Sequence, residues 1–319
     1  MAGHNRRVSS LPSALFPHAL SDAQAQRFAR LLVWVLPGLW SSNYLIARAA
    51  SGVVTPHVLA LGRWGMVVLF LLPWIWRDLA SLARIWRAEA SRMIALGTLG
   101  MWVCGAFVYQ GAQTTSAVNI GLIYAASPVG IALAGRWLLK EKATAVQRLS
   151  MALALAGVLV VVSRGDLASL LAVQLVPGDL WIAAAAVGWA AYTVLLQRWP
   201  TTLSGRQRLA CIVVGGLVVL VPFTALELWF IEVPPVSFQA VGLIVLAALL
   251  PGFLAYQAYD FMLRTLGATR TAVMLYLAPL YSAFNAWWIL GEVPSWFHAL
   301  GAVLILPGIY LATRGTSAR

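Results

Sequence analysis

Two stretches of this chain, AVNIGLIYAASPVGIALAGRWLLKE (117–141) and TAVMLYLAPLYSAFNAWWILGE (271–292), follow the same plan and indicate how the whole chain folds. Each is an apolar run with a proline near its middle and a glutamate at its end, and a glycine-bearing apolar run follows. The internal repeat is marked by three pairs of residues that share a spacing of 151 positions: Pro128 with Pro279, Glu141 with Glu292, and Gly157 with Gly308.

The repeat extends to the first apolar run of each half. Trp40 and Trp189 each follow closely after a glycine and are 149 positions apart. Each half then contains five predicted helices. Because five is an odd number, the second half would enter the membrane from the opposite side. Inverted repeats of this kind are typical of secondary transporters, whose substrate site lies near the membrane midplane between the halves.

The composition predicts a membrane protein. Of the 319 residues, 61% are hydrophobic and 10% are charged, and the mean hydropathy is +0.83. Soluble domains carry about 25% charged residues. The apolar runs are continuous, whereas barrel strands would alternate apolar and polar residues. We predict an all-α membrane protein with ten transmembrane helices in two inverted five-helix repeats, at 31–50, 57–76, 92–111, 117–139, 145–163, 179–198, 209–228, 238–260, 271–290 and 296–313.

These runs divide the chain into parts. The first 30 residues contain four arginines and no clean apolar core, so they resemble a cytoplasmic tail rather than a cleaved signal peptide. The predicted parts are a cytoplasmic N-terminal tail (1–30), a first five-helix repeat (31–163), an extracytoplasmic linker (164–178), a second five-helix repeat (179–313) and a cytoplasmic C-terminal tail (314–319).

The basic residues predict the orientation. The formal charge is +12, from 22 basic and 10 acidic residues. With ten spans and a cytoplasmic N-terminus, 18 basic residues fall on the cytoplasmic side, and only Arg48 and Arg164 fall on the other. Arg63 and Arg136 lie within spans. Because basic residues concentrate on the cytoplasmic side, we predict a multi-pass membrane protein with both termini cytoplasmic. The excess charge marks orientation and does not indicate a nucleic-acid partner.

No catalytic, metal or cofactor motif is present in the sequence. Cys104 and Cys211 fall inside apolar runs, which does not indicate a disulfide framework. The four histidines lie in the tail or at the ends of runs, without the spacing of metal ligands. There is no glycine-rich phosphate loop with a lysine. We therefore predict no enzymatic activity, no catalytic residue, no metal and no cofactor.

Polar and aromatic residues inside the spans are the candidates for a substrate cavity. A polar side chain that faces lipid is costly, so Asn43, Asn119 and Asn285 are expected to face other helices. Hydrogen bonds between helices are an equally common use of such residues, and Trp40 and Trp189 either pack between helices or line a cavity. The candidates are Trp40, Asn43, Arg63, Trp102, Gln110, Asn119, Tyr124, Trp189, Tyr192, Tyr256, Tyr276 and Asn285.

Two charged residues allow two interpretations each. Arg63 lies seven residues into its run, where its guanidinium either binds a substrate carboxylate or links helices through backbone carbonyls. Asp260 is four residues before Arg264, a spacing that favours an ion pair on one helix face. The other interpretation of Asp260 is a proton-carrying residue that couples transport.

The prolines of the repeat are predicted to kink their helices. Pro128 and Pro279 lie near the centres of their runs. A proline in the middle of a helix removes one backbone hydrogen bond and bends the helix. The carbonyls of Tyr124 and Leu275 would then need a partner from protein, water or ligand.

Taken in order, these motifs resemble the drug/metabolite transporter superfamily, specifically the ten-helix EamA-type transporters. The resemblance covers about residues 31–313 and is diffuse, and Ser41-Ser42 stands where the family often has Gly-Ser. The matching stretches are GLWSSNY (38–44), Arg63, YQGAQTTSAVNIGLIYAASPVGIALAGRWLLKE (109–141), GDL (178–180), GW (188–189), AP (278–279) and LGE (290–292).

The resemblance implies a secondary carrier of the bacterial inner (cytoplasmic) membrane that exports amino acids or other small organic metabolites. Its expected partners are a small-molecule substrate and the lipid bilayer, and the sequence carries no signal for an oligomeric state. A non-transporting membrane receptor or assembly subunit is the alternative, and it would bind a ligand or partner without flux. A channel is a third possibility, which would lack saturation and counterflow.

Overall fold

The computed structural model describes residues 21–115, 120, 123–124, 126–140, 143–166, 168, 176–232, 234–290, 293 and 295–314. Within those residues the chain is helical and contains no strand. Six helical segments are long and apolar enough to cross a membrane, and Trp296–Ala312 is a shorter apolar helix. This agrees with the predicted class, an all-helical membrane protein. The six segments are Pro56–Ala88, Ala90–Gly111, Ala145–Val162, Pro177–Arg198, Gly205–Phe230 and Phe238–Leu266.

The first half of the chain begins with one long helix, α1, and continues through α2 into a short helix, α3. Three elements, α4, η2 and α5, then follow one another without a break. The bounds are α1 (Asp22–Ala50), α2 (Pro56–Ile75), η1 (Trp76–Asp78), α3 (Leu79–Ala88), α4 (Ala90–Gly97), η2 (Thr98–Ala106), α5 (Phe107–Gly111), α7 (Ser127–Leu138) and α8 (Ala145–Val162).

The second half repeats several of these features. Its third long helical segment again contains a π-helical part, η4, between two α-helices. The bounds are α9 (Pro177–Arg198), α10 (Gly205–Phe230), α11 (Phe238–Ala247), η4 (Ala248–Leu254), α12 (Ala255–Leu266), α13 (Ala268–Ala272), η5 (Val273–Leu277), α14 (Ala278–Leu290) and α15 (Trp296–Arg314).

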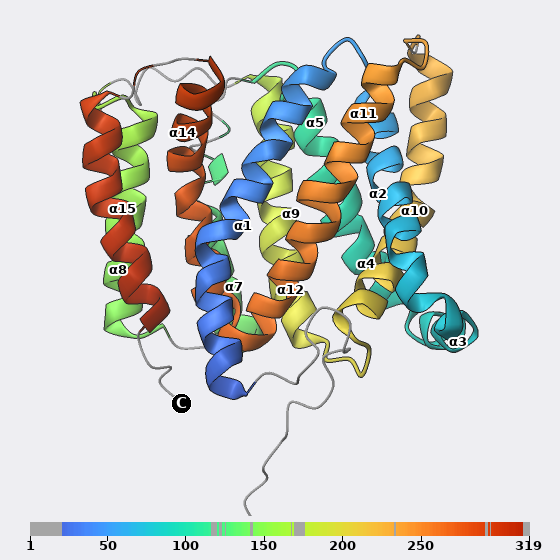
Figure 1. Ribbon diagram of the computed structural model, residues 1–319, viewed down its shortest axis with the longest axis horizontal. Helices are drawn as coiled ribbons and strands as arrows, with labels where there is room; N and C mark the ends of the chain where they lie inside the picture. The colour runs from blue at the N-terminus through green and yellow to red at the C-terminus, as the bar shows by residue number, and fades with distance from the viewer. Residues whose placement is uncertain are drawn as a thin grey trace, which may run out of the picture.

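The helices form a bundle whose long axes run in roughly one direction (Figure 1). The start of α1 and the end of α15 lie at the same end, which we call the basal end. Helices α8 and α15 lie side by side at one edge of the bundle, and α10 lies toward the other. Large apolar side chains such as Leu69, Val187 and Val221 are exposed on the outside. Such a surface suits contact with lipid rather than water.

Helix α3 is a short amphipathic helix at the basal end, beside the bundle (Figure 1). Leu82 is its buried residue, while Arg84 and Arg87 lie on the same short helix. The neighbouring Trp86 donates a hydrogen bond from its indole nitrogen to the carbonyl of Cys211 on α10, at 2.9 Å. A helix of this composition suits the interface between lipid and water. The sequence indicated only a basic connection here.

The beginning of α1 also differs from the expected boundary. The helix begins at Asp22, well before the span predicted at 31–50, so Arg27 and Arg30 belong to the helix. An aspartate in the first turn favours a helix start, because its negative charge interacts with the unpaired backbone amides. An apolar-run criterion misses this turn because its residues are mostly polar.

The prolines of the repeat lie at helix starts rather than in the middle of continuous α-helices. Pro128 lies in the first turn of α7, where a missing amide hydrogen costs no helical bond. Pro279 lies in the first turn of α14, directly after the 3-10 segment η5. The carbonyl of Leu275 accepts a hydrogen bond from the amide of Ala278, so it is not freed as the kink hypothesis required. At Pro279 the helix type changes from 3-10 to α.

Glycines allow the closest approaches between helices. A Cβ atom added at Gly97 would lie 2.1 Å from the backbone nitrogen of Gly216, and one added at Gly215 would lie 2.3 Å from the carbonyl oxygen of Met93. Helices α4 and α10 therefore touch backbone to backbone. Likewise, a Cβ at Gly157 would lie 2.8 Å from the carbonyl oxygen of Gly301, where α8 meets α15. Small residues allow this kind of packing in membranes.

Candidate functional site

A cavity of about 80 Å³ lies inside the bundle and is lined by residues from both halves of the chain. One water needs roughly 10–15 Å³ by this kind of measure, so the cavity has room for more than one. Its polar lining comes mainly from α1 and α2, and its aromatic lining comes also from α9 and α12. The lining residues are Pro37, Trp40, Ser41, Asn43, Arg63, Cys104, Val108, Tyr124, Trp189, Tyr256, Met274, Leu275 and Ala278.

Three aromatic side chains form one wall of this cavity. The rings of Trp40 and Trp189 meet edge to face with their centroids 5.0 Å apart. The ring of Tyr256 lies 6.3 Å from Trp40 and 5.9 Å from Trp189, again at steep angles. Edge-to-face contacts are favourable for aromatic rings. We call Trp40, Trp189 and Tyr256 the aromatic wall.

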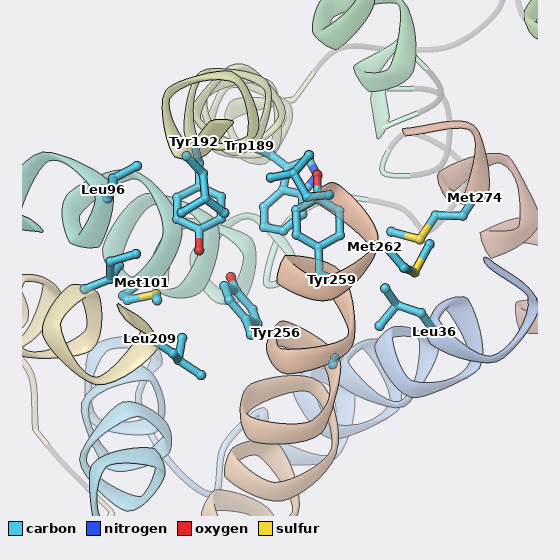
Figure 2. Packing of buried hydrophobic residues seen from close by; sticks show 14 of the residues in the cluster. Leu36, Leu96, Met101, Trp189, Tyr192, Leu209, Tyr256, Tyr259, Met262 and Met274 are labelled. Carbon is cyan, nitrogen blue, oxygen red and sulfur yellow. The ribbon is translucent and has the colours of Figure 1, made fainter. Parts of the chain in front are cut away.

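A second layer of aromatic residues supports this wall. Tyr259 packs against Trp189 at 4.9 Å, and its hydroxyl lies 2.6 Å from the hydroxyl of Thr193. Tyr192 stacks on Trp189 at 5.4 Å. Figure 2 shows the hydroxyls of Tyr192 and Tyr256 pointing toward one another from α9 and α12. The wall is therefore packed on its far side, which fixes the positions of its rings.

Arg63 is the only charged residue among the lining residues that the structure describes. Its side chain is 3% exposed. The Nη1 group donates to the Oδ1 of Asn43 at 3.2 Å and to the hydroxyl of Tyr109 at 3.0 Å, and Nη2 donates to the carbonyl of Pro251 at 2.9 Å. The Tyr109 hydroxyl in turn donates to Asn43 at 2.8 Å. Arg63 thus links α2 with α1, α5 and η4.

The π-helical segments supply carbonyl acceptors around the same site. The indole nitrogen of Trp64 donates to the carbonyl of Met101 at 3.1 Å, and the hydroxyl of Tyr256 donates to the carbonyl of Gly100 at 2.9 Å. Both carbonyls belong to η2, while the carbonyl bound by Arg63 belongs to η4. Single π turns in α-helices occur frequently at functional sites. Here they turn backbone oxygens toward side chains of other helices.

The predicted cavity residues divide into three groups. The cavity is lined by Trp40, Asn43, Arg63, Tyr124, Trp189 and Tyr256. The described residues that do not line it are Trp102, Gln110, Tyr192 and Tyr276. Asn119 and the side chain of Asn285 lie outside the described residues.

Each residue in the second group has another location. Tyr192 packs behind the aromatic wall, and Tyr276 is fully buried in η5. Trp102 donates a hydrogen bond to His57 at 3.3 Å and stacks on Phe223 of α10. Gln110 is half-buried on α5. The run in which a residue occurs did not reveal which face of the helix it occupies.

Sequence reasoning missed Tyr109, which positions Arg63, and the small or apolar lining residues. Tyr109 was visible inside its apolar run, and a polar atom at such a depth is a signal. Cys104 also lines the cavity, and its thiol donates to the carbonyl of Ala185 at 3.4 Å. Nothing in the sequence distinguishes Val108, Met274 or Ala278 from other apolar residues of their spans.

Asp260 lies away from the cavity, in a cluster of charges near the end of α12. Its Oδ2 lies 2.9 Å from the Nε of Arg264, the ion pair expected from their spacing. Its Oδ1 lies 3.6 Å from the Nη1 of Arg208, which is 5% exposed. Arg208 also donates to the carbonyls of Leu196 and Trp199. The cluster ties α9, α10 and α12 together.

A buried carboxylate also joins α10 to the start of α2. Glu227 accepts hydrogen bonds from the Thr55 hydroxyl at 2.6 Å, from the backbone amides of His57 and Val58, and from the Nδ1 of His57 at 2.9 Å. A carboxylate is stabilised at a helix N-terminus by the unpaired amides. The sequence placed His57 and Glu227 at the ends of two different spans and gave no reason to pair them.

Comparison with known proteins places this architecture in a family. The sequence profile of the EamA-like transporter family matches residues 28–163 and 176–314, one match for each half. The chain belongs to the EamA-like transporter family. It is therefore a multi-pass membrane transporter of the drug/metabolite transporter superfamily, as the resemblance of its motifs implied.

Individual relatives extend over nearly the whole chain. The chain is 28% identical to an uncharacterized transporter of Archaeoglobus fulgidus over 278 residues, which cover 86% of this chain and 93% of the relative. It is 25% identical to an S-adenosylmethionine/S-adenosylhomocysteine transporter of Chlamydia trachomatis, with 87% of each chain covered. A probable terminal-alkyne amino-acid exporter of Streptantibioticus cattleyicolor is 26% identical, with 73% of this chain and 76% of the relative covered.

A solved structure shares the fold. A chain whose crystal structure is known superposes with a TM-score of 0.71, covering 89% of this chain and 96% of the other, at 22% identity. The superposition covers both halves of the bundle, and it shows a shared fold only.

Proposed function

We propose that this transporter is an inner-membrane secondary carrier that exports amino acids or other small organic metabolites by alternating access. The observation that carries the proposal is the cavity, which lies between the helices of the bundle and is lined by both halves of the chain. Carriers of this kind hold their substrate between two repeats that rock against each other. The relative named as an amino-acid exporter supports export as the direction.

Packing between the helices supports ten spans in two inverted repeats. Helix α1 packs against η4, α12 and α14 of the other half, and its counterpart α9 packs against the equivalent elements η2, α5 and α7 of the first half. The pairs α2 with α10 and α8 with α15 join equivalent helices of the two halves. The π segments also correspond, because η2 begins at Thr98 and η4 begins 150 positions later at Ala248. Exchange of the halves therefore preserves the contacts.

The distribution of basic residues supports a cytoplasmic basal end. Arg84 and Arg87 lie on α3, which is at the basal end together with the start of α1 and the end of α15 (Figure 1). Basic residues favour the cytoplasmic side. A single cysteine placed at Arg84 is expected to react with a thiol reagent only from the cytoplasmic side, and one placed at Glu232 only from outside. The reverse pattern would contradict this orientation.

Flux from proteoliposomes tests the transport proposal directly. The full chain, purified and reconstituted, is expected to move a candidate amino acid or organic acid with saturation and with counterflow. Saturable binding without flux would identify a receptor, and flux without saturation or counterflow would identify a channel. Absence of movement for every candidate in both directions would contradict the proposal.

A further inference from the structure

We propose that the cargo is an organic carboxylate with an apolar or aromatic body, whose anionic group binds Arg63 and whose body packs on the aromatic wall. This inference rests on the proposed function and names the class of its substrate. The site is expected to bind an organic acid more tightly than an amine with the same apolar or aromatic body.

The described hydrogen-bond partners of Arg63 carry no charge. Its three protein acceptors, the amide oxygen of Asn43, the hydroxyl of Tyr109 and the carbonyl of Pro251, are all neutral. No described residue forms an ion pair with it, since the charged contacts in the described part of the chain join Glu227 to His57 and Asp260 to Arg208 and Arg264. A charge held inside a membrane protein is costly unless it is paired. The positive charge of Arg63 is therefore not neutralised by a described residue, and a bound anion would stabilise it.

The chain has few acidic residues that could neutralise Arg63. Ten are present, and eight of them lie within the described residues. None of the described residues that line the cavity is acidic. The other two, Glu141 and Glu292, follow the apolar runs 117–139 and 271–290 in the sequence. An anion that neutralises Arg63 inside the cavity is thus expected to come from outside the chain.

Two hydrogen-bond donors of cavity-lining residues have no partner among the described residues. The Nε of Arg63 and the Nε1 of Trp189 are buried and have no hydrogen-bond partner among the described residues. Both residues line the cavity, and Trp189 is 6% exposed. A guanidinium has five N–H donors, of which the bonds to Asn43, Tyr109 and Pro251 use three. Unused donors beside a fixed positive charge match the acceptors of a carboxylate.

The remaining lining of the cavity suits an apolar or aromatic ligand body. The aromatic wall presents rings from α1, α9 and α12, and Met274, Leu275 and Ala278 add apolar surface. An ammonium group can interact with the faces of aromatic rings. In this cavity, however, it would lie near an unpaired guanidinium with no acid to balance the two charges. The lining therefore favours an acid over an amine.

Three ligands with one body provide the test. They are 3-phenylpropionate, 3-phenylpropan-1-ol and 3-phenylpropan-1-amine, and their binding to the purified full chain is measured by thermal shift and by quenching of tryptophan fluorescence. The acid is expected to bind roughly 10- to 100-fold more tightly than the alcohol, because hydrogen bonds to charged groups contribute that much. The amine is expected to bind more weakly than the alcohol. This comparison uses the unmodified chain and does not depend on a variant's folding.

Variants then assign the preference to Arg63. Arg63→Gln is expected to abolish the preference for the acid, and Arg63→Lys is expected to retain part of it. Arg264→Gln is the matched control, because its side chain is 40% exposed and pairs with Asp260 away from the cavity. This control is expected to keep the full preference.

The outcomes distinguish this inference from the proposed function. Saturable flux of the amine or alcohol without a preference for the acid would overturn the carboxylate proposal and leave the carrier proposal standing. A thermal shift with sodium chloride alone that also blocks the acid would show an inorganic anion as the partner of Arg63, which also overturns it. Absence of flux for all three ligands, with tight binding of the acid, would contradict the carrier proposal and leave the carboxylate site.

Discussion

Arg63 and Arg208 are two buried arginines with opposite surroundings. They are 3% and 5% exposed, respectively, and both donate to backbone carbonyls. Arg208 has the carboxylate of Asp260 at 3.6 Å, and Arg264 completes that cluster. Arg63 lines the cavity and contacts only neutral acceptors among the described residues.

The difference separates a structural charge from a functional one. Arg208 has a carboxylate partner in Asp260, and this cluster holds three helices together. Arg63 is held in place by Asn43 and Tyr109 but is not neutralised. An ionisable residue inside a membrane span is a functional candidate by default, and this comparison shows which of the two arginines fits that description.

The largest expected effect is on stability, from removal of Arg208. The variant Arg208→Met leaves two backbone carbonyls without their donor and breaks a buried ion pair. Removal of one partner of such a pair costs about 3–5 kcal/mol, and we expect about 3 kcal/mol because Arg264 still contacts Asp260. The measurement is the free energy of unfolding of the purified protein in mixed micelles.

Two control variants sharpen this result. Arg264→Met is expected to cost less than about 1 kcal/mol, since partly exposed ion pairs contribute little. Arg63→Met is expected to lower stability less than Arg208→Met, because no carboxylate is left behind. Equal losses of stability for Arg63→Met and Arg208→Met would contradict the distinction between the two arginines.

The second-largest effect is expected when Arg63 receives a carboxylate partner, as Arg208 has in Asp260. In Asn43→Asp, a carboxylate replaces the amide whose oxygen lies 3.2 Å from the guanidinium, and Tyr109 can still donate to it. We expect the melting temperature to rise and the affinity for an organic acid to fall roughly 10- to 100-fold, as the built-in anion competes with the ligand. The control is Asn43→Ser, which adds no charge. Unchanged acid binding in Asn43→Asp would contradict a role for Arg63 as the anion site.

Sequence patterns reached the fold class and part of the cavity for physical reasons. The bilayer requires long apolar helices, so continuous apolar runs locate them, and burial of polar groups in such runs drew attention to Trp40, Asn43 and Arg63. Partners across helices are not encoded in spacing. The bond from Arg63 to Pro251 depends on a π segment that turns a carbonyl aside, and no residue pattern announces it.

The same limit explains why the sequence did not predict the helix position of Pro128 or the partners of Glu227. The position of Pro128 in its run predicted a kink, but a proline is equally suited to the first turn of a helix, and Pro128 lies in the first turn of α7. Glu227 lies near the end of an apolar run, so its burial against His57 was visible only once α2 and α10 were placed together. Pairing between distant elements needs the fold.

A smaller effect is expected from Asp260→Asn, which separates a structural role from proton coupling. The substitution leaves Arg208 and Arg264 without a carboxylate, so stability falls by about 1–3 kcal/mol. If the carboxylate serves the ion cluster alone, the ratio of flux with and without an imposed pH gradient stays as in the parent. Loss of that ratio in a variant that is still folded would make Asp260 the coupling residue.

The smallest effect compares two tryptophans that differ as the two arginines do. The Nε1 of Trp64 donates to the carbonyl of Met101, whereas the Nε1 of Trp189 has no partner among the described residues. Both substitutions remove buried ring atoms, so Trp64→Phe is expected to cost about 1 kcal/mol more stability than Trp189→Phe, the usual net value of one hydrogen bond. Trp189→Phe keeps a smaller aromatic ring beside Trp40 and removes a donor that has no partner among the described residues. It should lower the melting temperature less than Trp64→Phe does and weaken binding of an organic acid by roughly 2- to 10-fold. A stability loss in Trp189→Phe as large as that in Trp64→Phe, with acid binding intact, would show that the Trp189 nitrogen serves packing and not the ligand.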